Sequence, residues 1–432
     1  MYVSKDLSTN ESGHLAIGGV DTVELAQQYG TPLCVFDEDL IRSHCEQFKS
    51  SIDRYYHGAG LVCYASKAFC CKEMLRIVND ENCGADIVSI GELYTAMSVD
   101  FPAEKICYHG NNKTAEELNL ALDYGVGRIV VDNLNELNLL NELAAAKGKT
   151  ATVLLRITPG IDAHTHSFIQ TGQIDSKFGM TIEFGAAMEG VKTALALLNI
   201  NLDGVHCHIG SQIFDIDPFE HAAEVMLNFI ADIKKECGYE INTMNLGGGF
   251  GIMYVPSDDP VEYDLYMKRV SDVVKAKAEE LNVKLPFIII EPGRSIVAPA
   301  GITLYTVGGV KEIPGVRKYV SIDGGMTDNI RYALYESEYD FVIANKAGEP
   351  KDDVVTVAGR CCESGDLLGK DLPLQKAEVG DTLAVCATGA YNYSMANHYN
   401  RVRKPAVVMV KGGESRVVIR RETLEDIISC DI

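Results

Sequence analysis

Short apolar runs alternate with amphipathic segments over roughly the first three hundred residues of the chain. Eight of these runs are rich in β-branched residues, and they span 61–67, 85–90, 106–110, 128–133, 152–159, 203–210, 243–250 and 287–291. The first five begin 21 to 24 residues apart, which is a regular repeat. Runs this apolar are typical of strands that are buried on both faces, as in a parallel sheet.

The segments between these runs have the periodicity and the end signals of helices. Thr114 has Glu117 three residues further on, which is the spacing of a capping box, and Asn133 stands in the same relation to Glu136. Strand and helix alternating eight times predicts an α/β fold with a (β/α)8 TIM barrel over 36–300. A doubly wound open sheet is the alternative, but no GxGxxG motif follows the first strand.

The pattern changes after about residue 300. Strand-like runs separated by turns of Gly, Pro and charged residues lie at 302–310, 318–323, 340–344, 354–360, 382–388, 406–411 and 416–420. Helical periodicity returns only at 423–429. This predicts a C-terminal all-β domain, sandwich or barrel-like, built from 301–432 together with residues 1–35.

Composition narrows the class of protein without naming an activity. The chain has 432 residues, with 39 Lys and Arg against 61 Asp and Glu, a net charge of −22. So acidic a chain is not expected to bind nucleic acid or anionic lipid. No 18-residue apolar run and no N-terminal leader pattern is present, so neither a membrane span nor secretion is expected. The odd total of 13 cysteines predicts reduced thiols in a cytoplasmic protein.

Polar residues follow most of the predicted barrel strands, at the end where TIM barrels place their active sites. These are Lys67, His109, Asp132, Arg156, His206, His208, Ser211, the triglycine 247–249, Glu291 and Arg294. Each one alone has a plain structural explanation: a lysine can be a solvated strand end, glycines a tight turn, and a histidine part of the core. Their recurrence at strand after strand predicts a single site.

Three of these features together suggest pyridoxal 5′-phosphate as the cofactor. A partly desolvated amine at Lys67 can form a Schiff base with an aldehyde. Glycine N–H groups after the seventh strand can bind phosphate, where Ser211 could add a hydroxyl and Arg294 a cation. Glu291 supplies the acidic partner that keeps a pyridine nitrogen protonated.

These residues lie in motifs that resemble a known family along nearly the whole chain. The motifs are YASKA at 64–68, DIVSIGEL at 86–93, HGNNKT at 109–114, RITPGIDAHTH at 156–166, DSKFGM at 175–180, HCHIGSQI at 206–213, LGGGFG at 246–251, EPGRS at 291–295, DNIRYALY at 328–335, CCESGD at 361–366 and the aromatic run 391–393. The chain resembles the diaminopimelate decarboxylases, which belong to the fold type III, alanine-racemase-like pyridoxal-phosphate enzymes. CESGD after DNIRYALY is the more specific signal for diaminopimelate.

The resemblance implies a role for each matching residue. Lys67 is similar to the lysine that forms the Schiff base, and His208 to the histidine that stacks on the cofactor ring. The remaining cofactor contacts would be Ser211, Gly248, Gly249, Glu291, Pro292, Gly293, Arg294 and Tyr391. Glu291 is the one expected at the pyridine nitrogen.

The substrate has an amino-acid group at each end, so a cation and an anion are needed beyond the cofactor. The resemblance implies that Arg294, Arg331 and Tyr335 hold a substrate carboxylate, that Glu363 takes the distal ammonium, and that Tyr391 touches substrate as well as cofactor. Cys362 is similar to the cysteine that protonates the decarboxylated carbon. In this family Cys362 and Glu363 reach the site from the partner subunit, which implies a homodimer with shared active sites.

Other functions remain as alternatives. A related decarboxylase of the same fold could act on ornithine, arginine or carboxynorspermidine. From a different class, the pairs His164–His166 and His206–His208 could mark a metal-dependent barrel hydrolase, although such sites usually place this pair on the first strand. No metal is therefore expected. A non-catalytic relative that binds a protein partner should have lost the lysine or the thiol, and this chain has both.

Overall fold

The computed structural model describes residues 2–161 and 175–432, and the chain divides into two compact units. The first, here called the barrel unit, comprises residues 44–251 and 260–293. The second, here called the β unit, comprises residues 1–43, 252–259 and 294–432. Each unit is described on its own.

A closed parallel barrel forms the barrel unit, as the repeat predicts. Among the described residues, eight strands make the ring in the order β5-β6-β7-β8-β9-β11-β12-β13, and β13 pairs with β5 while β8 pairs with β9. The strands are β5 (Gly60–Ala65), β6 (Gly84–Ile87), β7 (Ile106–Tyr108), β8 (Arg128–Val131), β9 (Ala151–Thr158), β11 (Ile200–His206), β12 (Thr243–Asn245) and β13 (Phe287–Ile290). Each lies within or overlaps one of the eight apolar runs, and a short strand β10 (Met180–Thr181) extends β9.

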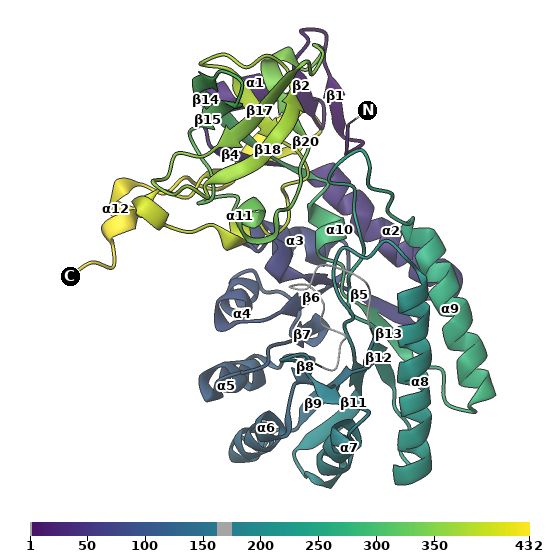
Figure 1. The fold of residues 1–432 in the computed structure, drawn as a ribbon. Coiled ribbons are helices and arrows are strands. Elements are labelled where there is room, and N and C mark those ends of the chain that lie inside the picture. The colour runs from purple at the N-terminus through teal and green to yellow at the C-terminus, as the bar shows by residue number, and fades with distance from the viewer. Residues whose placement is uncertain (1, 162–174) are drawn as a thin grey trace. The chain divides into compact units, whose positions relative to one another are not determined.

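Helices lie outside these strands (Figure 1). They are α3 (Lys72–Asp80), α4 (Ile90–Met97), α5 (Ala115–Tyr124), α6 (Leu134–Ala146), α7 (Ala186–Ala196), α8 (Asp217–Cys237) and α9 (Tyr263–Glu280), with α2 (Glu38–Tyr56) beginning in the β unit. The two caps predicted from the sequence are confirmed. Thr114 and Glu117 form a capping box on α5, and the Asn133 side chain accepts from the Glu136 N–H at the start of α6.

Apolar side chains from five strands meet in a buried cluster of the barrel unit. Its members are Cys63, Cys107, Val130, Leu154 and Ile289, each at most 1% exposed. Because interiors are packed as densely as organic crystals, this cluster holds the strand ends at fixed spacing. The barrel is thus a rigid base for the polar residues that follow its strands.

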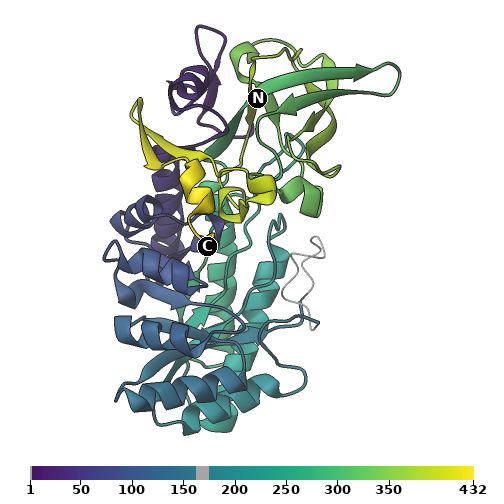
Figure 2. The same ribbon diagram turned by 90° about the vertical axis from the view of Figure 1, so that its left-hand side faces the viewer.

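The β unit contains a three-stranded sheet and a larger sheet of nine strands among the described residues. The small sheet is β1 (Leu7–Thr9), β2 (Leu15–Ile17) and β3 (Val20–Asp21), followed by α1 (Thr22–Tyr29). The large sheet contains β4 (Leu33–Asp37), β14 (Gly301–Ile313), β15 (Arg317–Ile322), β16 (Phe341–Ile343), β17 (Asp353–Ala358), β18 (Leu367–Leu374), β19 (Thr382–Val385), β20 (Ala406–Lys411) and β21 (Glu414–Ile419). Figure 2 shows the β14–β15 hairpin as a long ribbon at the edge of this unit. Short helices α10 (Arg294–Val297), α11 (Arg331–Tyr335) and α12 (Leu424–Ile428) complete it.

The large sheet differs from the sequence expectation at β18 and at its edges. Strand β18 was not predicted, because Gly369 and Pro373 interrupt its alternation and charged residues occupy its middle. Residues 36–37 belong to β4, which pairs with β14 and β20 of the β unit. Residues 294–300 also group with this unit, and Ala300 accepts a hydrogen bond from the Asp37 N–H. The unit boundaries therefore fall inside the predicted span of 36–300.

No helix within residues 2–161 and 175–432 combines the length and the apolarity needed to cross a membrane.

Replacing Leu154 by Ala should destabilise the barrel unit. The side chain is fully buried in the five-strand cluster, so the substitution removes apolar contacts and leaves a cavity. We expect a loss of about 3 kcal/mol in the free energy of unfolding, measured by chemical denaturation. The matched control is Leu198→Ala, at a leucine that is 94% exposed, where we expect a change below about 0.5 kcal/mol. Equal effects of the two substitutions would contradict the assignment of this core.

Candidate functional site

The barrel unit carries its expected site residues just beyond the ends of four strands. Lys67 lies in a 3-10 turn (Ser66–Ala68) directly after β5, with an exposed side chain. His208 and Ser211 follow β11, and Gly248 and Gly249 follow β12. Glu291, Pro292 and Gly293 follow β13. Because parallel strands of one barrel end on the same side, these residues are brought to one mouth of the barrel unit.

Glu291 is the centre of a buried hydrogen-bond network. Its Oε1 lies 2.7 Å from His109 Nε2 and accepts from Asn245 Nδ2 at 2.6 Å, while its Oε2 lies 3.2 Å from His206 Nε2. All four residues are at most 7% exposed, and they come from the ends of β7, β11, β12 and β13. The carboxylate is therefore held from three directions in one orientation.

Electrostatics in this network favour an ionised carboxylate. Burial pushes the pKa of Glu291 upward, but His109 and His206 outweigh it and hold that pKa well below its usual range. Burial lowers the pKa of His206 to about 3, although Glu291 opposes this shift. His206 is accordingly a neutral hydrogen-bond donor to an anion. A neighbouring acid, Asp86, has a raised pKa because it is buried.

Glycines are required in the turn after β12 by both backbone conformation and close packing. Gly247 and Gly249 have φ of +68° and +118°, where residues with a Cβ are strained. A Cβ on Gly248 would lie 2.1 Å from the Glu291 carbonyl oxygen. The Asn245 side chain also accepts from the Gly247 N–H at 2.8 Å, and the Gly248 N–H donates to His208 Nδ1 at 3.3 Å. The turn thus fixes the rings and the carboxylate around it.

The residues at this mouth fit the cofactor expected from the sequence. The donor set comprises an exposed lysine, an ionised carboxylate and a glycine turn. Among the described residues, three buried polar atoms near the ends of β5, β6 and β11 have no hydrogen-bond partner: Ser66 Oγ, Asp86 Oδ1 and His206 Nδ1. Unpartnered polar atoms are costly in a protein interior unless a ligand or water satisfies them. Lys67, Glu291 and the glycine turn could hold a pyridine aldehyde phosphate.

Two arginines and a tyrosine of the β unit form a buried group, here called the arginine cluster. Arg294 Nη1 donates to the Tyr254 hydroxyl at 2.6 Å, and Arg331 Nη1 donates to the same oxygen at 2.8 Å. The Arg294 guanidinium carbon also lies 4.8 Å from the Tyr391 ring centroid, and that of Arg331 lies 6.0 Å from the Tyr335 ring. The structure therefore brings together the three residues expected at a substrate carboxylate, Arg294, Arg331 and Tyr335, and places Tyr391 beside them.

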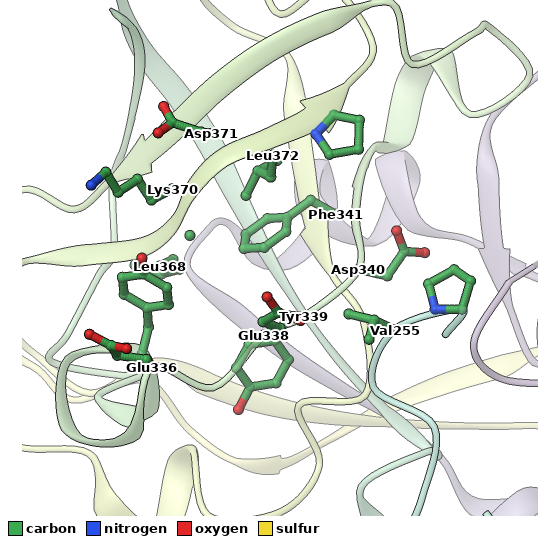
Figure 3. A pocket seen from close by; sticks show the side chains of 14 residues that line it. Val255, Glu336, Glu338, Tyr339, Asp340, Phe341, Leu368, Lys370, Asp371 and Leu372 are labelled. Atoms are coloured by element: carbon green, nitrogen blue, oxygen red, sulfur yellow. The ribbon is translucent and has the colours of Figure 1, made fainter. Parts of the chain in front are cut away.

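A pocket of about 450 Å³ lies in the β unit beside this cluster (Figure 3). Tyr339 takes part in both, because it lines the pocket and its ring lies edge-on to that of Tyr254 at 5.3 Å. The charged groups around the pocket are Glu336, Glu338, Asp340, Lys370 and Asp371. So acidic a lining would repel a carboxylate, whereas the arginine cluster would attract one.

Cys362 and Glu363 lie in an exposed loop between β17 and β18. Asp366 anchors this loop, because its buried carboxylate accepts from the backbone N–H groups of Cys361 and Met326. Burial and Asp366 raise the pKa of the Cys361 thiol to about 11, whereas the side chain of Cys362 is exposed. Within the described residues, no hydrogen bond or ion pair joins Cys362 or Glu363 to the arginine cluster.

Two residues, Tyr254 and Asn245, were not predicted from the sequence. Tyr254 follows the glycine motif in a segment without regular structure, and nothing in its spacing indicates that it meets Arg294 and Arg331. Asn245 is the last residue of β12, so its position at a strand end was the signal that could have found it.

A metal site is the competing interpretation of the histidines. His109, His206 and Glu291 are the one group of three potential ligands found among the described residues, with ligand atoms within 4.8 Å of one another. The contact of 2.7 Å between His109 and Glu291 is a hydrogen-bond distance, and their direct pairing accounts for the arrangement. The other expected pair, His164 and His166, lies outside the described residues.

Comparison with known proteins agrees with this geometry. Residues 38–298 match the family model of the pyridoxal-dependent decarboxylases, pyridoxal binding domain. The chain is 49% identical to the diaminopimelate decarboxylase of Bacillus subtilis, over all of this chain and 98% of the relative. It is 42% identical to that of Mycobacterium tuberculosis, over 99% and 97% of the two chains.

A solved structure has the same fold over the full length. The diaminopimelate decarboxylase of M. jannaschii, in complex with L-lysine, superposes with a TM-score of 0.92 at 38% identity, covering 100% of this chain and 99% of that one. The cofactor of such enzymes is the one that fits the barrel mouth. By its motifs, fold and full-length similarity, this chain belongs to the diaminopimelate decarboxylase family of pyridoxal-phosphate enzymes.

Proposed function

We propose that this chain decarboxylates meso-2,6-diaminopimelate to L-lysine and CO2, the last step of lysine biosynthesis. The observation that carries the proposal is the buried, ionised Glu291, held by His109, His206 and Asn245 at the end of the last barrel strand. The full-length relatives named as diaminopimelate decarboxylases support the choice of substrate over ornithine, arginine or carboxynorspermidine.

When bound, pyridoxal phosphate supplies a protonated, electron-withdrawing ring that accepts the electron pair left when CO2 departs. Glu291 maintains that electron demand, because an anionic partner favours the protonated pyridine nitrogen. Lys67 would hold the cofactor aldehyde, and the turn containing Gly248 and Gly249 would offer backbone N–H groups to the phosphate. The ring of His208, to which the Gly248 N–H donates, would stack on the cofactor.

The remaining cofactor contacts would come from the ends of β11 and β13 and from the β unit. Ser211 would offer a hydroxyl to the phosphate, and Pro292 and Gly293 would contact the cofactor through the backbone after Glu291. Tyr391, whose ring lies against Arg294, would contact cofactor and substrate. The barrel unit would thus carry most of the cofactor-binding residues, and the β unit the substrate-binding arginines.

The substrate needs one cation and one anion beyond the cofactor. Arg294 and Arg331, two guanidiniums that converge on one oxygen, would bind a substrate carboxylate with the help of Tyr335. Glu363 would bind the distal ammonium. After CO2 leaves, the thiol of Cys362 gives its proton to the α-carbon, so that a hydrogen replaces the lost carboxylate.

The active enzyme would be a homodimer with shared sites. Cys362 and Glu363 are exposed on their own chain, which suits residues that complete the site of a partner subunit. The thirteen cysteines all lie in the described part of the chain and are free thiols, which supports a cytoplasmic location.

Incubation with meso-diaminopimelate should yield CO2 and L-lysine in equal amounts, measured by gas release and amino-acid analysis. Lys67→Ala should abolish turnover and the visible cofactor band that borohydride removes from the wild type, because the substitution removes the amine that is proposed to form the Schiff base. Turnover of ornithine with none of diaminopimelate would overturn the substrate. Bound zinc without the visible band would instead favour the hydrolase.

Adjacent cysteines allow a matched test of the proton donor. Cys362→Ala should lower kcat by about 10²-fold or more with little change in KM, because it removes a group that acts after substrate binds. Cys361→Ala should leave kcat within about threefold, since that thiol faces Asp366 within its own loop. Equal losses in the two variants would contradict the assignment to Cys362.

The same variant tests the shared sites. Mixing inactive Lys67→Ala and Cys362→Ala dimers under subunit exchange should restore about a quarter of wild-type activity, because half of the dimers become mixed and each has one intact site. If no activity returns although exchange is verified by mass spectrometry, each site is built from one chain.

Stability should fall as the solution is acidified. The pKa of His206 is lowered to about 3 by burial, whereas an unfolded histidine titrates near pH 6.5. Between these values the unfolded chain binds more protons, so its free energy of unfolding decreases with falling pH, by up to about 1.4 kcal/mol per pH unit for each proton. Glu291 adds to this at lower pH, because its lowered pKa makes it stabilising only while ionised.

His206→Gln should therefore give a shallower dependence of the free energy of unfolding on pH, between about pH 6 and 4. The control is His221→Gln, at an imidazole that is 60% exposed, which should leave the slope unchanged. Identical slopes in all three proteins would show that His206 is not held neutral.

A further inference from the structure

The hydroxyl of Tyr254 accepts hydrogen bonds from two arginines at once. Arg294 donates to it at 2.6 Å and Arg331 at 2.8 Å, and all three residues are at most 7% exposed. Two buried guanidiniums repel each other, so a shared acceptor between them is needed to keep both in one place. Burial raises the pKa of Tyr254, whereas the two arginines lower it. The net shift is downward, as expected for an oxygen that accepts hydrogen bonds from two positively charged groups.

Tyr254 is itself held rigidly on both its backbone and its ring. Asp258 accepts from the backbone N–H groups of Tyr254 and Val255, at 2.9 and 3.1 Å, which closes the turn that carries the ring. The ring lies edge-on to Tyr339, whose hydroxyl donates to Asn392 at 3.1 Å. The Arg331 guanidinium carbon lies 5.2 Å from the Tyr254 ring centroid. A fixed oxygen is therefore presented to both arginines.

We propose that Tyr254 is a positioning residue, whose hydroxyl sets the Arg294 and Arg331 guanidiniums in the arrangement that receives the substrate carboxylate. This rests on the proposed function, and it deepens that function by assigning carboxylate recognition to a preorganised group of three residues. Tyr254 acts through the arginines and not on the reacting atoms. Preorganised donors bind a planar carboxylate tightly because little rotamer freedom is lost on binding.

A purely structural role for Tyr254 predicts a different result. A tyrosine that only fills space would keep its function as phenylalanine, since the ring is retained and the packing against Tyr339 is unchanged. A positioning hydroxyl would be needed for binding while the chemical step is largely spared. The separation of KM from kcat therefore distinguishes the two roles.

The test compares Tyr254→Phe with Tyr56→Phe in the holoenzyme. Tyr56 is the matched control, because its buried hydroxyl donates to the Pro286 carbonyl and touches no arginine. We expect Tyr254→Phe to raise KM for diaminopimelate about tenfold with kcat within about threefold, and Tyr56→Phe to change neither. The visible cofactor band and the Tm should remain those of the wild type in Tyr254→Phe.

A second measurement does not depend on turnover. Pimelate, the seven-carbon dicarboxylate without amino groups, is titrated into each holoenzyme by calorimetry. Its Kd should rise about tenfold in Tyr254→Phe, which corresponds to the loss of one charge-assisted hydrogen-bond arrangement. If the wild type binds pimelate but releases no CO2 from diaminopimelate, the proposed function fails while the positioning role stands.

Other outcomes overturn the positioning role. These are equal pimelate affinity in the wild type and Tyr254→Phe, no pimelate binding by the wild type, or a fall in kcat with KM unchanged. Should Tyr254→Phe fail to fold, Arg331→Lys keeps the cluster testable, because lysine cannot donate both to Tyr254 and to a carboxylate in the guanidinium geometry. That variant must show the same rise in KM and in the Kd for pimelate, and wild-type values for both would overturn the proposal.

Discussion

One buried carboxylate determines how the barrel end is arranged. Glu291 can remain ionised away from water only because His109, His206 and Asn245 donate to it from three other strands. Those donors keep their places because the strands beneath them are locked by a packed core. The glycine turn after β12 is tied to the same network through the Asn245 side chain. Orientation of the carboxylate and shape of the turn are thus two results of one set of contacts.

The β unit buries two cations near each other. Arg294 and Arg331 are both buried, and two buried cations destabilise each other. The Tyr254 oxygen and the surrounding aromatic rings reduce that cost, and no carboxylate among the described residues pairs with Arg331. Under the proposed function, a substrate carboxylate would bind to donors that are already aligned, and selectivity for a substrate with a free carboxylate would follow from the cluster as a whole.

The loop of Cys362 illustrates how neighbouring residues acquire different properties. The Asp366 carboxylate accepts from the Cys361 N–H, and burial together with Asp366 raises the pKa of the Cys361 thiol, whereas the next residue is exposed. The role proposed for Cys362, in the site of another subunit, would need an exposed thiol on a fixed backbone. The Asp366 carboxylate fixes the backbone, because it accepts from the N–H groups of Cys361 and Met326.

Local signals along the chain were sufficient for the barrel, its caps and the strand-end residues. Buried parallel strands need apolar runs, and helix starts need residues such as Thr114 and Asn133, so these features are written in short stretches of sequence. The motif resemblance supplied the expectations for Arg331, Tyr335, Cys362 and Glu363, together with the family. Strand β18 was missed because its pairing with β17, and not its own pattern, makes it a strand.

Only the tertiary structure decided which side chains meet. Tyr254 and Arg331 are 77 residues apart, and His109 and Glu291 are 182 apart, so no periodicity relates them. The lowered pKa of Glu291, the neutral state of His206 and the shared Tyr254 oxygen depend on burial and on distances of a few ångströms. Hydrophobic pattern and local caps determine where elements form, because they act between near neighbours. Polar networks require the packed fold, because their donors and acceptors come from different elements.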